Sequence, residues 1–118
     1  MTWEVEVTDE FVSWYRTLQL SESDAVDEAV ALLEDRGPAL GRPLADTLQG
    51  SRLPNLKELR PLGGSIRILF AFDPRRVAIL LLGGDKSGQW QSWYQMMIPR
   101  AEQLYDDHLA QLRREGLH

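Results

Sequence analysis

The stretch that most constrains the fold is residues 56–86, LKELRPLGGSIRILFAFDPRRVAILLLGGDK, which has the pattern of three successive β-strands. Leucine, β-branched and aromatic residues fill the two longer strands, as is usual in sheets. Pro61 and the two glycines after it interrupt the chain, because proline lacks a backbone N–H and glycine allows positive φ. Pro74 suits the second position of a type I turn. The pattern predicts an antiparallel meander, with strands at 56–60, 65–72 and 77–82 and with Gly83-Gly84 ending the last.

The middle strand of this meander alternates between two kinds of side chain. Its isoleucines and phenylalanines fall on every second residue and share one face, which we expect to form the core. Arg67 points to the opposite face. Segment 52–76 holds six basic and two acidic residues, a net charge of +4, although the whole chain has a net charge of −5. A basic sheet in an acidic chain indicates an anionic ligand at the sheet.

Two amphipathic helices are predicted before the meander. Residues 2–7 alternate apolar and acidic side chains, as a half-buried strand does. Residues 9–19 follow, with apolar side chains at helical spacing. A second helix is expected from Ser21 to Arg36, with Ser21 and Asp24 as a capping box and a glycine–proline pair after its last residue. The two helices are expected to form a hairpin.

The remaining segments are a long loop and a last helix. Residues 37–55 contain three glycines and three prolines and are predicted to form a loop. Residues 87–97 fit neither a helix nor a strand pattern, and Pro99 suits the first turn of a C-terminal helix. The order β-α-α-β-β-β-α predicts a single α+β domain over residues 1–118. Its small, mostly antiparallel sheet carries the helical hairpin on one face and leaves the other face partly open.

Composition excludes several classes of protein. The chain has no cysteine, so it can contain neither a disulfide nor a cysteine zinc site. We see no signal peptide and no apolar run long enough to span a membrane, so we expect a cytoplasmic location and no membrane partner. The negative net charge argues against a general nucleic-acid coat protein but allows a local phosphate site. The glycines match no phosphate loop, and we expect no cofactor and no metal.

Several short motifs follow one another in a fixed order: LKELR at 56–60, SIRILFAFDP at 65–74, LLLGGDK at 80–86, then Trp93-Tyr94, Ile98-Pro99 and Ala101…Leu104-Tyr105. In this order they resemble the RelE/ParE superfamily of toxins from type II toxin–antitoxin systems, and most of all its HigB-like, phage-derived branch. The resemblance covers nearly the whole chain. It implies a RelE-like fold.

The resemblance also implies a toxin that a cognate antitoxin protein holds inactive. HigB- and RelE-type toxins cut mRNA in the ribosomal A site, whereas ParE-type toxins inhibit DNA gyrase without being nucleases. The shared fold does not decide between these activities. We expect a ribosome-dependent endoribonuclease, with ribosome and mRNA as partners. A gyrase inhibitor of the ParE type and an inactive module that only binds its antitoxin are the alternatives.

Metal-free RNA cleavage requires a base for the 2′-hydroxyl, cations for the phosphate and an acid for the leaving oxygen. Arg67 matches the phosphate-binding arginine of the family. Lys57 matches the basic residue on the strand before it. Lys86 follows the third strand, where members of the family carry a catalytic side chain, and Asp85 could orient Lys86 or act as a base. These four residues are the predicted catalytic set.

The predicted RNA-binding residues are Arg60, Arg75, Arg76, Trp93 and Tyr94. The arginines extend the basic surface, and aromatic rings stack on bases of any sequence. The two aromatic residues could instead pack the last helix onto the core. Alternation places Lys57 and Arg60 on opposite faces, so both serve one site only if the strand kinks or Arg60 reaches round its edge. Glu58 could pair with a neighbouring base.

Two ways of binding the antitoxin are open. An acidic antitoxin segment could cover the basic sheet around Arg67, or a basic segment could bind the helical hairpin. We favour the hairpin, because electrostatic steering would draw a basic partner to its acidic surface. That surface consists of Glu22, Asp24, Asp27, Glu28, Glu34 and Asp35.

Overall fold

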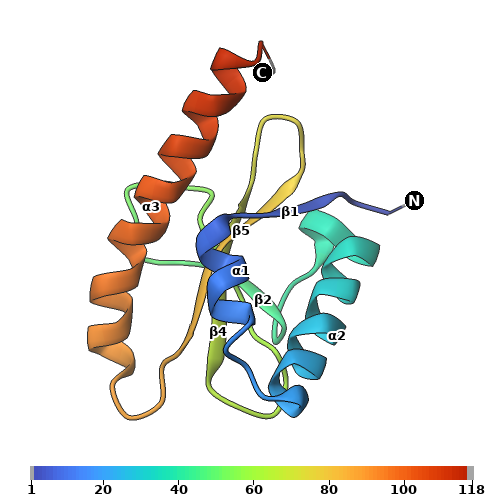
Figure 1. Cartoon of the computed structure of the whole chain (residues 1–118), viewed down its shortest axis with the longest axis vertical. Coiled ribbons are helices and arrows are strands. Elements are labelled where there is room, and N and C mark those ends of the chain that lie inside the picture. The colour runs from blue at the N-terminus through green and yellow to red at the C-terminus, as the bar shows by residue number, and fades with distance from the viewer. Residues whose placement is uncertain (1, 117–118) are drawn as a thin grey trace.

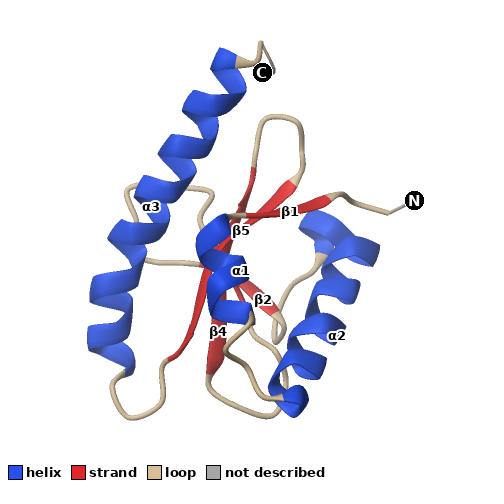
Figure 2. Ribbon diagram, viewed as in Figure 1, coloured by secondary structure: helices blue, strands red, loops and turns tan. Residues whose placement is uncertain are grey.

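The computed structural model describes residues 2–116 and contains a five-stranded sheet. The strand order is β1-β5-β4-β3-β2, in which β1 is parallel to β5 and the other neighbours are antiparallel (Figure 2). The strands are β1 (Val5–Val7), β2 (Ala45–Thr47), β3 (Lys57–Leu59), β4 (Ile66–Phe72) and β5 (Ala78–Asp85). The predicted meander is confirmed as β3, β4 and β5. Its alternation places Ile66, Ile68 and Phe70 in one core, as expected.

Helices cover both faces of the sheet (Figure 1). They are α1 (Asp9–Tyr15), α2 (Leu20–Arg36), which a 3₁₀ turn (Gly37–Ala39) follows, and α3 (Trp90–Arg114). The predicted hairpin, α1 and α2, packs on one face through Phe11, Val26 and Leu33. The expectation of a partly open second face is wrong, because α3 buries its apolar side against that face. Among residues 2–116, no helix combines the length and hydrophobicity that crossing a lipid bilayer requires.

The segment predicted as a long loop contributes the edge strand β2. Ala45 lies opposite Leu59, and Thr47 lies opposite Lys57. A three-residue strand between prolines and glycines has too short a pattern to be read from sequence. Its stability comes from the pairing with β3 and from burial of Ala45 rather than from its own composition.

Two helix starts differ from the prediction. α2 is capped by Gln19, whose backbone N–H donates to Glu22 Oε1 at 2.9 Å, so the capping box lies two residues before the one expected at Ser21. α3 begins at Trp90, and Pro99 therefore lies inside the helix rather than in its first turn. Tertiary packing of the first turns of α3 on the sheet outweighs the local signal of the proline.

Strand β5 continues through the two glycines that were expected to end it. Its register shifts after Leu82, so that Leu81 is bulged and both leucines face α3. Gly83 then faces Trp14, and Gly84 faces Trp93 on the other side of the sheet. A Cβ on Gly84 would lie 2.5 Å from Trp93 Nε1. The glycines therefore serve close packing of two indoles, and the longer strand determines where Lys86 leaves the sheet.

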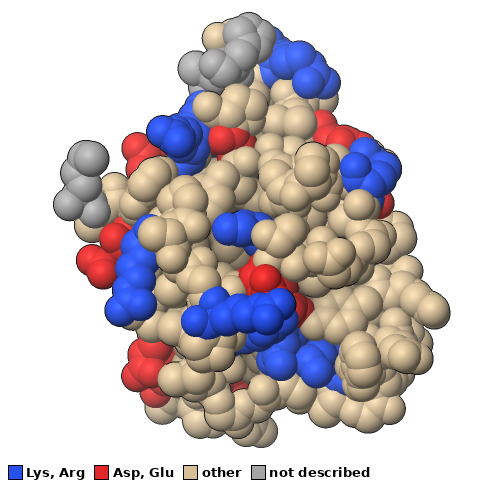
Figure 3. Space-filling view, turned by 180° about the vertical axis from the view of Figure 1, so that it is seen from behind, with Lys and Arg blue, Asp and Glu red and all other residues tan. Residues whose placement is uncertain are grey.

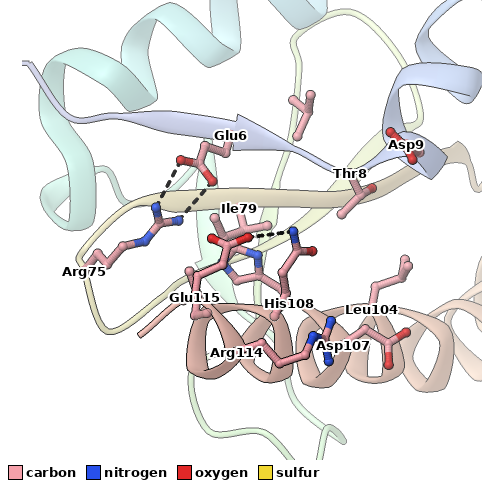
Figure 4. Close-up of a pocket in the computed structure, with 13 residues that line it drawn as sticks. Glu6, Thr8, Asp9, Arg75, Ile79, Leu104, Asp107, His108, Arg114 and Glu115 are labelled. Carbon is pink, nitrogen blue, oxygen red and sulfur yellow. Dashed lines mark hydrogen bonds and ion pairs between the residues drawn. The ribbon is translucent and has the colours of Figure 1, made fainter. Parts of the chain in front are cut away.

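The turn between β4 and β5 is organised by Asp73, whose side chain is 0% exposed. Its carboxylate accepts hydrogen bonds from the backbone N–H of Arg75 and Val77 and from the Arg75 guanidinium. His108 Nε2 on α3 lies 2.9 Å away. Arg75 also donates to Glu6 on β1, at 2.9 Å for the shorter bond (Figure 4). Asp73 thus links the turn to α3, and its partner Arg75 links the turn to β1.

We expect Asp73→Ala to lower the free energy of unfolding by about 3 kcal/mol, because removing one partner of a buried ion pair leaves the others uncompensated. Burial alone would raise the pKa of Asp73, but the bonds from His108, Arg75 and Val77 outweigh it and lower the pKa. The contribution of Asp73 to the free energy of unfolding is therefore fully present above the pKa of about 3.9 that Asp73 has in the unfolded chain. It is lost as the pH falls through the lower pKa of Asp73 in the folded protein. Urea unfolding at pH 7 and at acidic pH measures both effects. Asp24→Ala, on an exposed site, is the control, and an unchanged midpoint for Asp73→Ala would refute the assignment.

Candidate active site

A pocket of about 250 Å³ lies where β3, β4 and the chain after β5 meet the first turns of α3. We call it the central pocket. Its lining consists of Glu58, Arg60, Arg67, Lys86, Trp90 and Tyr94. Three cations thus surround one carboxylate. The face of the molecule seen in Figure 3 shows Lys and Arg side chains gathered around a small acidic area.

Glu58 is the buried centre of this pocket, with a side chain that is 3% exposed. It lies opposite Leu69 on the α3 side of the sheet, because β3 alternates and Leu59 faces the other core. Arg60 Nε donates to Glu58 Oε2 at 2.9 Å. The Tyr94 hydroxyl donates to Glu58 Oε1. A carboxylate held in this way is oriented and shielded from bulk water.

Arg67 lies next to Glu58 with unused hydrogen-bonding capacity. Its Nη1 donates to the backbone oxygen of Ile66 at 2.7 Å, and this bond holds the guanidinium in place. Its Nε is 3.8 Å from Glu58 Oε1, too far for a hydrogen bond. Among residues 2–116, Arg67 Nε is the one buried side-chain nitrogen or oxygen that lacks a partner. An unpaired buried donor of a cation is suited to an incoming anion.

The rim of the central pocket is formed by Lys86 and Trp90. Lys86 Nζ lies 5.5 Å from the centroid of the Trp90 ring, within the range of a cation–π contact. Trp90 is 55% exposed. Its ring meets that of Tyr94 edge to face, at 6.3 Å between centroids. The rim therefore offers a cation and an open aromatic surface.

Tyr94 acts as a hydrogen-bond donor in this pocket rather than as an anion. Burial and the bond to Glu58 raise its pKa well above the usual value of a phenol, which keeps its proton in place at neutral pH. The phenol thereby orients Glu58 and does not compete with it as a base.

The structure brings four of the predicted site residues together: Arg60, Arg67, Lys86 and Tyr94. Arg60 reaches the pocket because alternation along the chain places it on the same side of the sheet as Glu58, two residues before it. Lys57 stays on the opposite face, where its Nζ lies 5.8 Å from the Phe72 ring centroid. The sequence-based conflict between Lys57 and Arg60 is therefore resolved in favour of Arg60.

Four other predicted residues lie outside the central pocket. Arg75 and Arg76 belong to the turn after β4, at the far end of the hairpin from the Arg67–Gly84 pair. Trp93 is buried against Gly84, as the packing alternative proposed. Asp85 turns to the α2 side and accepts from Ser65 Oγ at 2.5 Å. Bonds from Ser65 and from Ser87 lower the pKa of Asp85, which makes it a weak base.

Two residues of the pocket were absent from the predicted site. Glu58 was recognised only as a partner for a neighbouring base, although a lone acid within a basic strand was a usable signal. Trp90 was missed because the start of α3 was placed at Pro99. With the helix beginning at Trp90, residues 90 and 94 fall four apart and share a face.

A larger hollow of about 560 Å³ lies between β1 and the second half of α3 (Figure 4). Its central charges are already paired, since Arg75 bonds Glu6 and His108 bonds Asp73. It lacks the unpaired buried donor that distinguishes the central pocket. We therefore assign the chemistry to the central pocket.

Sequence comparisons link the chain to toxins. Residues 13–106 match the model of the family described as phage-derived protein Gp49-like (DUF891). The Mycobacterium tuberculosis protein named as toxin HigB3 is 54% identical over 97 residues, 82% of this chain and 85% of that protein. The one named as toxin HigB2, from the same species, is 45% identical over 112 residues. That match spans 92% of this chain but 55% of HigB2.

Solved structures of RelE-type complexes share the fold. A chain of the archaeal RelE–RelB complex from Pyrococcus horikoshii has a TM-score of 0.60 and 19% identity, over 75% of this chain and 99% of its own length. A chain of the RelBE2 toxin–antitoxin complex of Mycobacterium tuberculosis has a TM-score of 0.56 and 18% identity, over 72% of this chain and 99% of its own. These likenesses confirm the predicted RelE-like fold.

Proposed function

Because the chain belongs to the phage-derived Gp49-like family, we propose that it is the toxin of a type II toxin–antitoxin system and cuts mRNA at the central pocket. The HigB relatives and the RelE-type structures confirm the predicted HigB-like, RelE-type identity. The observation that carries the nuclease proposal is the unpaired Nε of Arg67 beside the buried Glu58 carboxylate. A carboxylate that can accept a proton and a guanidinium that can donate a hydrogen bond to a phosphate therefore lie side by side.

In this proposal Glu58 is the general base. Its carboxylate takes the proton of a ribose 2′-hydroxyl, and the 2′-oxygen forms a bond to the adjacent phosphorus. Tyr94 keeps the carboxylate oriented. Glu58 replaces Asp85 as the base, because Glu58 lies in the pocket with the cations and Asp85 does not line it.

The cations serve the phosphate and the leaving group. Arg67 and Arg60 stabilise the negative charge that develops on the phosphorane, for which a planar guanidinium with several donors is well suited. As the bond between phosphorus and the 5′-oxygen breaks, the Lys86 ammonium gives a proton to that oxygen. The products are a 2′,3′-cyclic phosphate and a free 5′-hydroxyl.

The end groups of the fragments test this mechanism. We expect induced expression to arrest growth, and mRNA from these cells to be cut to fragments with 5′-hydroxyl and 2′,3′-cyclic phosphate ends. Cutting should persist with EDTA, provided that enough magnesium remains to keep ribosomes intact. Fragments with 5′-phosphates would contradict the proposal. Intact mRNA together with blocked DNA supercoiling would favour the gyrase alternative.

We further propose a cognate antitoxin as partner and the hairpin α1–α2 as its docking surface. Asp24, Glu28 and Asp35 are exposed along α2, and Asp27 accepts a hydrogen bond from the Tyr15 hydroxyl at 2.6 Å. A basic antitoxin segment would be steered to this surface. Reversing the charge of Asp24 and Glu28 should slow antitoxin association about tenfold at low salt and leave toxicity intact. Unchanged association, with binding lost in Arg67→Glu, would place the antitoxin over the central pocket instead.

A further inference from the structure

A second hollow, of about 520 Å³, adjoins the central pocket on the side of β2. The two share Glu58, Arg60, Trp90 and Tyr94, so they form one continuous depression. Its volume falls within the range of about 300–1,000 Å³ that is typical of small-molecule sites. We call it the glutamine groove, after the amide side chains of Gln49, Gln91 and Gln95 that line it.

The charges divide between the two hollows. Arg67 and Lys86 line the central pocket but not the glutamine groove. The groove adds one acid, Asp46, and apolar surface from Leu48 and Ile98. A phosphate is therefore favoured in the central pocket, and a neutral group with apolar faces and polar edges is favoured in the groove. A nucleotide has this division, with the phosphate at one end and the base at the other.

The three amides are positioned to reach the edge of a planar ligand. Gln91 and Gln95 are four residues apart on one face of α3, and Gln49 faces them from the segment after β2. All three are exposed. Within residues 2–116, their side-chain amides make no hydrogen bond to another residue. Their donors and acceptors are thus available to a ligand.

The aromatic pair Trp90 and Tyr94 completes the groove at its junction with the central pocket. Bases of single-stranded RNA are typically stacked on aromatic rings and hydrogen-bonded along their edges. Trp90 is held by contacts with Lys86 and Tyr94 but keeps much of its ring exposed. It provides a stacking surface between the phosphate end and the amide end.

We infer that the glutamine groove binds the nucleobase next to the scissile phosphate, and that Gln49, Gln91 and Gln95 select which base it is. This inference rests on the proposed nuclease function for the placement of the phosphate. A glutamine amide reads a base edge through one donor and one acceptor, so its loss removes discrimination rather than charge. The groove thereby makes the enzyme selective for part of the codon.

Cut-site mapping on ribosomes tests the inference. In the wild type we expect one base to be enriched next to the cut. The double variant Gln91→Leu/Gln95→Leu should lower this enrichment about tenfold, which is the discrimination that one well-formed contact with a base edge provides. Leucine preserves the helix and the packing volume. Gln103→Leu, whose glutamine lies on the same helix but bonds Asp107 outside the groove, is the matched control and should keep the wild-type pattern.

A binding measurement separates this inference from the proposed nuclease function. Four RNA hexanucleotides that differ in one base, each with a 2′-deoxyribose at the attacking position, are titrated into the wild type. Binding is followed by the intrinsic tryptophan fluorescence of the protein, to which Trp90 in the groove contributes. Tighter binding of one base, lost in the double variant, supports the groove even if the wild type cuts no mRNA. Equal binding of all four, or an unchanged preference in the double variant, overturns it. Loss of antitoxin binding with an intact base preference assigns the groove to the antitoxin and also overturns it.

Discussion

Replacing Arg67 by alanine is expected to lower the rate of mRNA cutting about 10²–10³-fold, and with it toxicity, while the chain remains folded. The guanidinium lies next to Glu58 with a buried donor that no residue among 2–116 satisfies, so we expect this donor to bind the substrate phosphate. Its side chain is 16% exposed and lies at the edge of the core rather than within it. The measurement is single-turnover cutting on programmed ribosomes, with a thermal melt of the same preparation.

The controls for this variant distinguish charge, geometry and folding. Arg67→Lys keeps the charge but loses the planar fork, so it should recover only part of the rate. Arg76→Ala, at the exposed turn at the far end of the hairpin, should cut like the wild type. Full toxicity of Arg67→Ala at equal expression would refute the phosphate assignment. A collapsed melt would show that the bond from Nη1 to the Ile66 oxygen makes Arg67 structural.

Replacing Glu58 by glutamine is expected to lower the cutting rate about 10²–10⁴-fold, the contribution of a general base. The amide has nearly the same shape, and its oxygen can still accept the hydrogen bond from Tyr94. Substrate binding should therefore weaken much less than the chemical step, because both arginines remain. Single-turnover rates give the chemical step, and affinity for a 2′-deoxy-substituted RNA gives the binding.

The matched control for Glu58→Gln is Asp85→Asn. Asp85 is the carboxylate proposed as a base from the sequence, and it is held by Ser65 and Ser87 outside the central pocket. We expect Asp85→Asn to retain cutting within a few-fold of the wild type. A strong loss in Asp85→Asn together with near-normal cutting by Glu58→Gln would reverse the assignment of the base.

Several features could be read from the sequence because they depend on neighbouring residues. The strict alternation in β4 placed Arg67 on the face opposite Ile66, Ile68 and Phe70, as the structure confirms. The same local patterns predicted the helical hairpin and the turn at Asp73. The order of the short motifs identified the RelE-type, HigB-like family.

What the sequence could not determine depends on residues far apart in the chain. Strand β2 exists because β3 offers it a partner, and the first turns of α3 are held by packing on β5. The bulge at Leu81 arises from the register between β4 and β5. Each of these features outweighs the local signal of prolines or glycines, because burial and pairing contribute more than propensity.

The candidate active site shows the same difference between what local sequence patterns predict and what long-range packing decides. Periodicity predicts which face of the sheet a side chain occupies, and it correctly separated Lys57 from Arg60. Periodicity does not predict which charged side chains on that face contact one another. Glu58 and Tyr94 are 36 residues apart and come together only because α3 crosses the sheet there. The sequence by itself therefore determined the family, the core strands and the face of the sheet that carries Arg67. The tertiary structure decided that Glu58 is the buried neighbour of Arg67, because long-range packing sets the distances between charges.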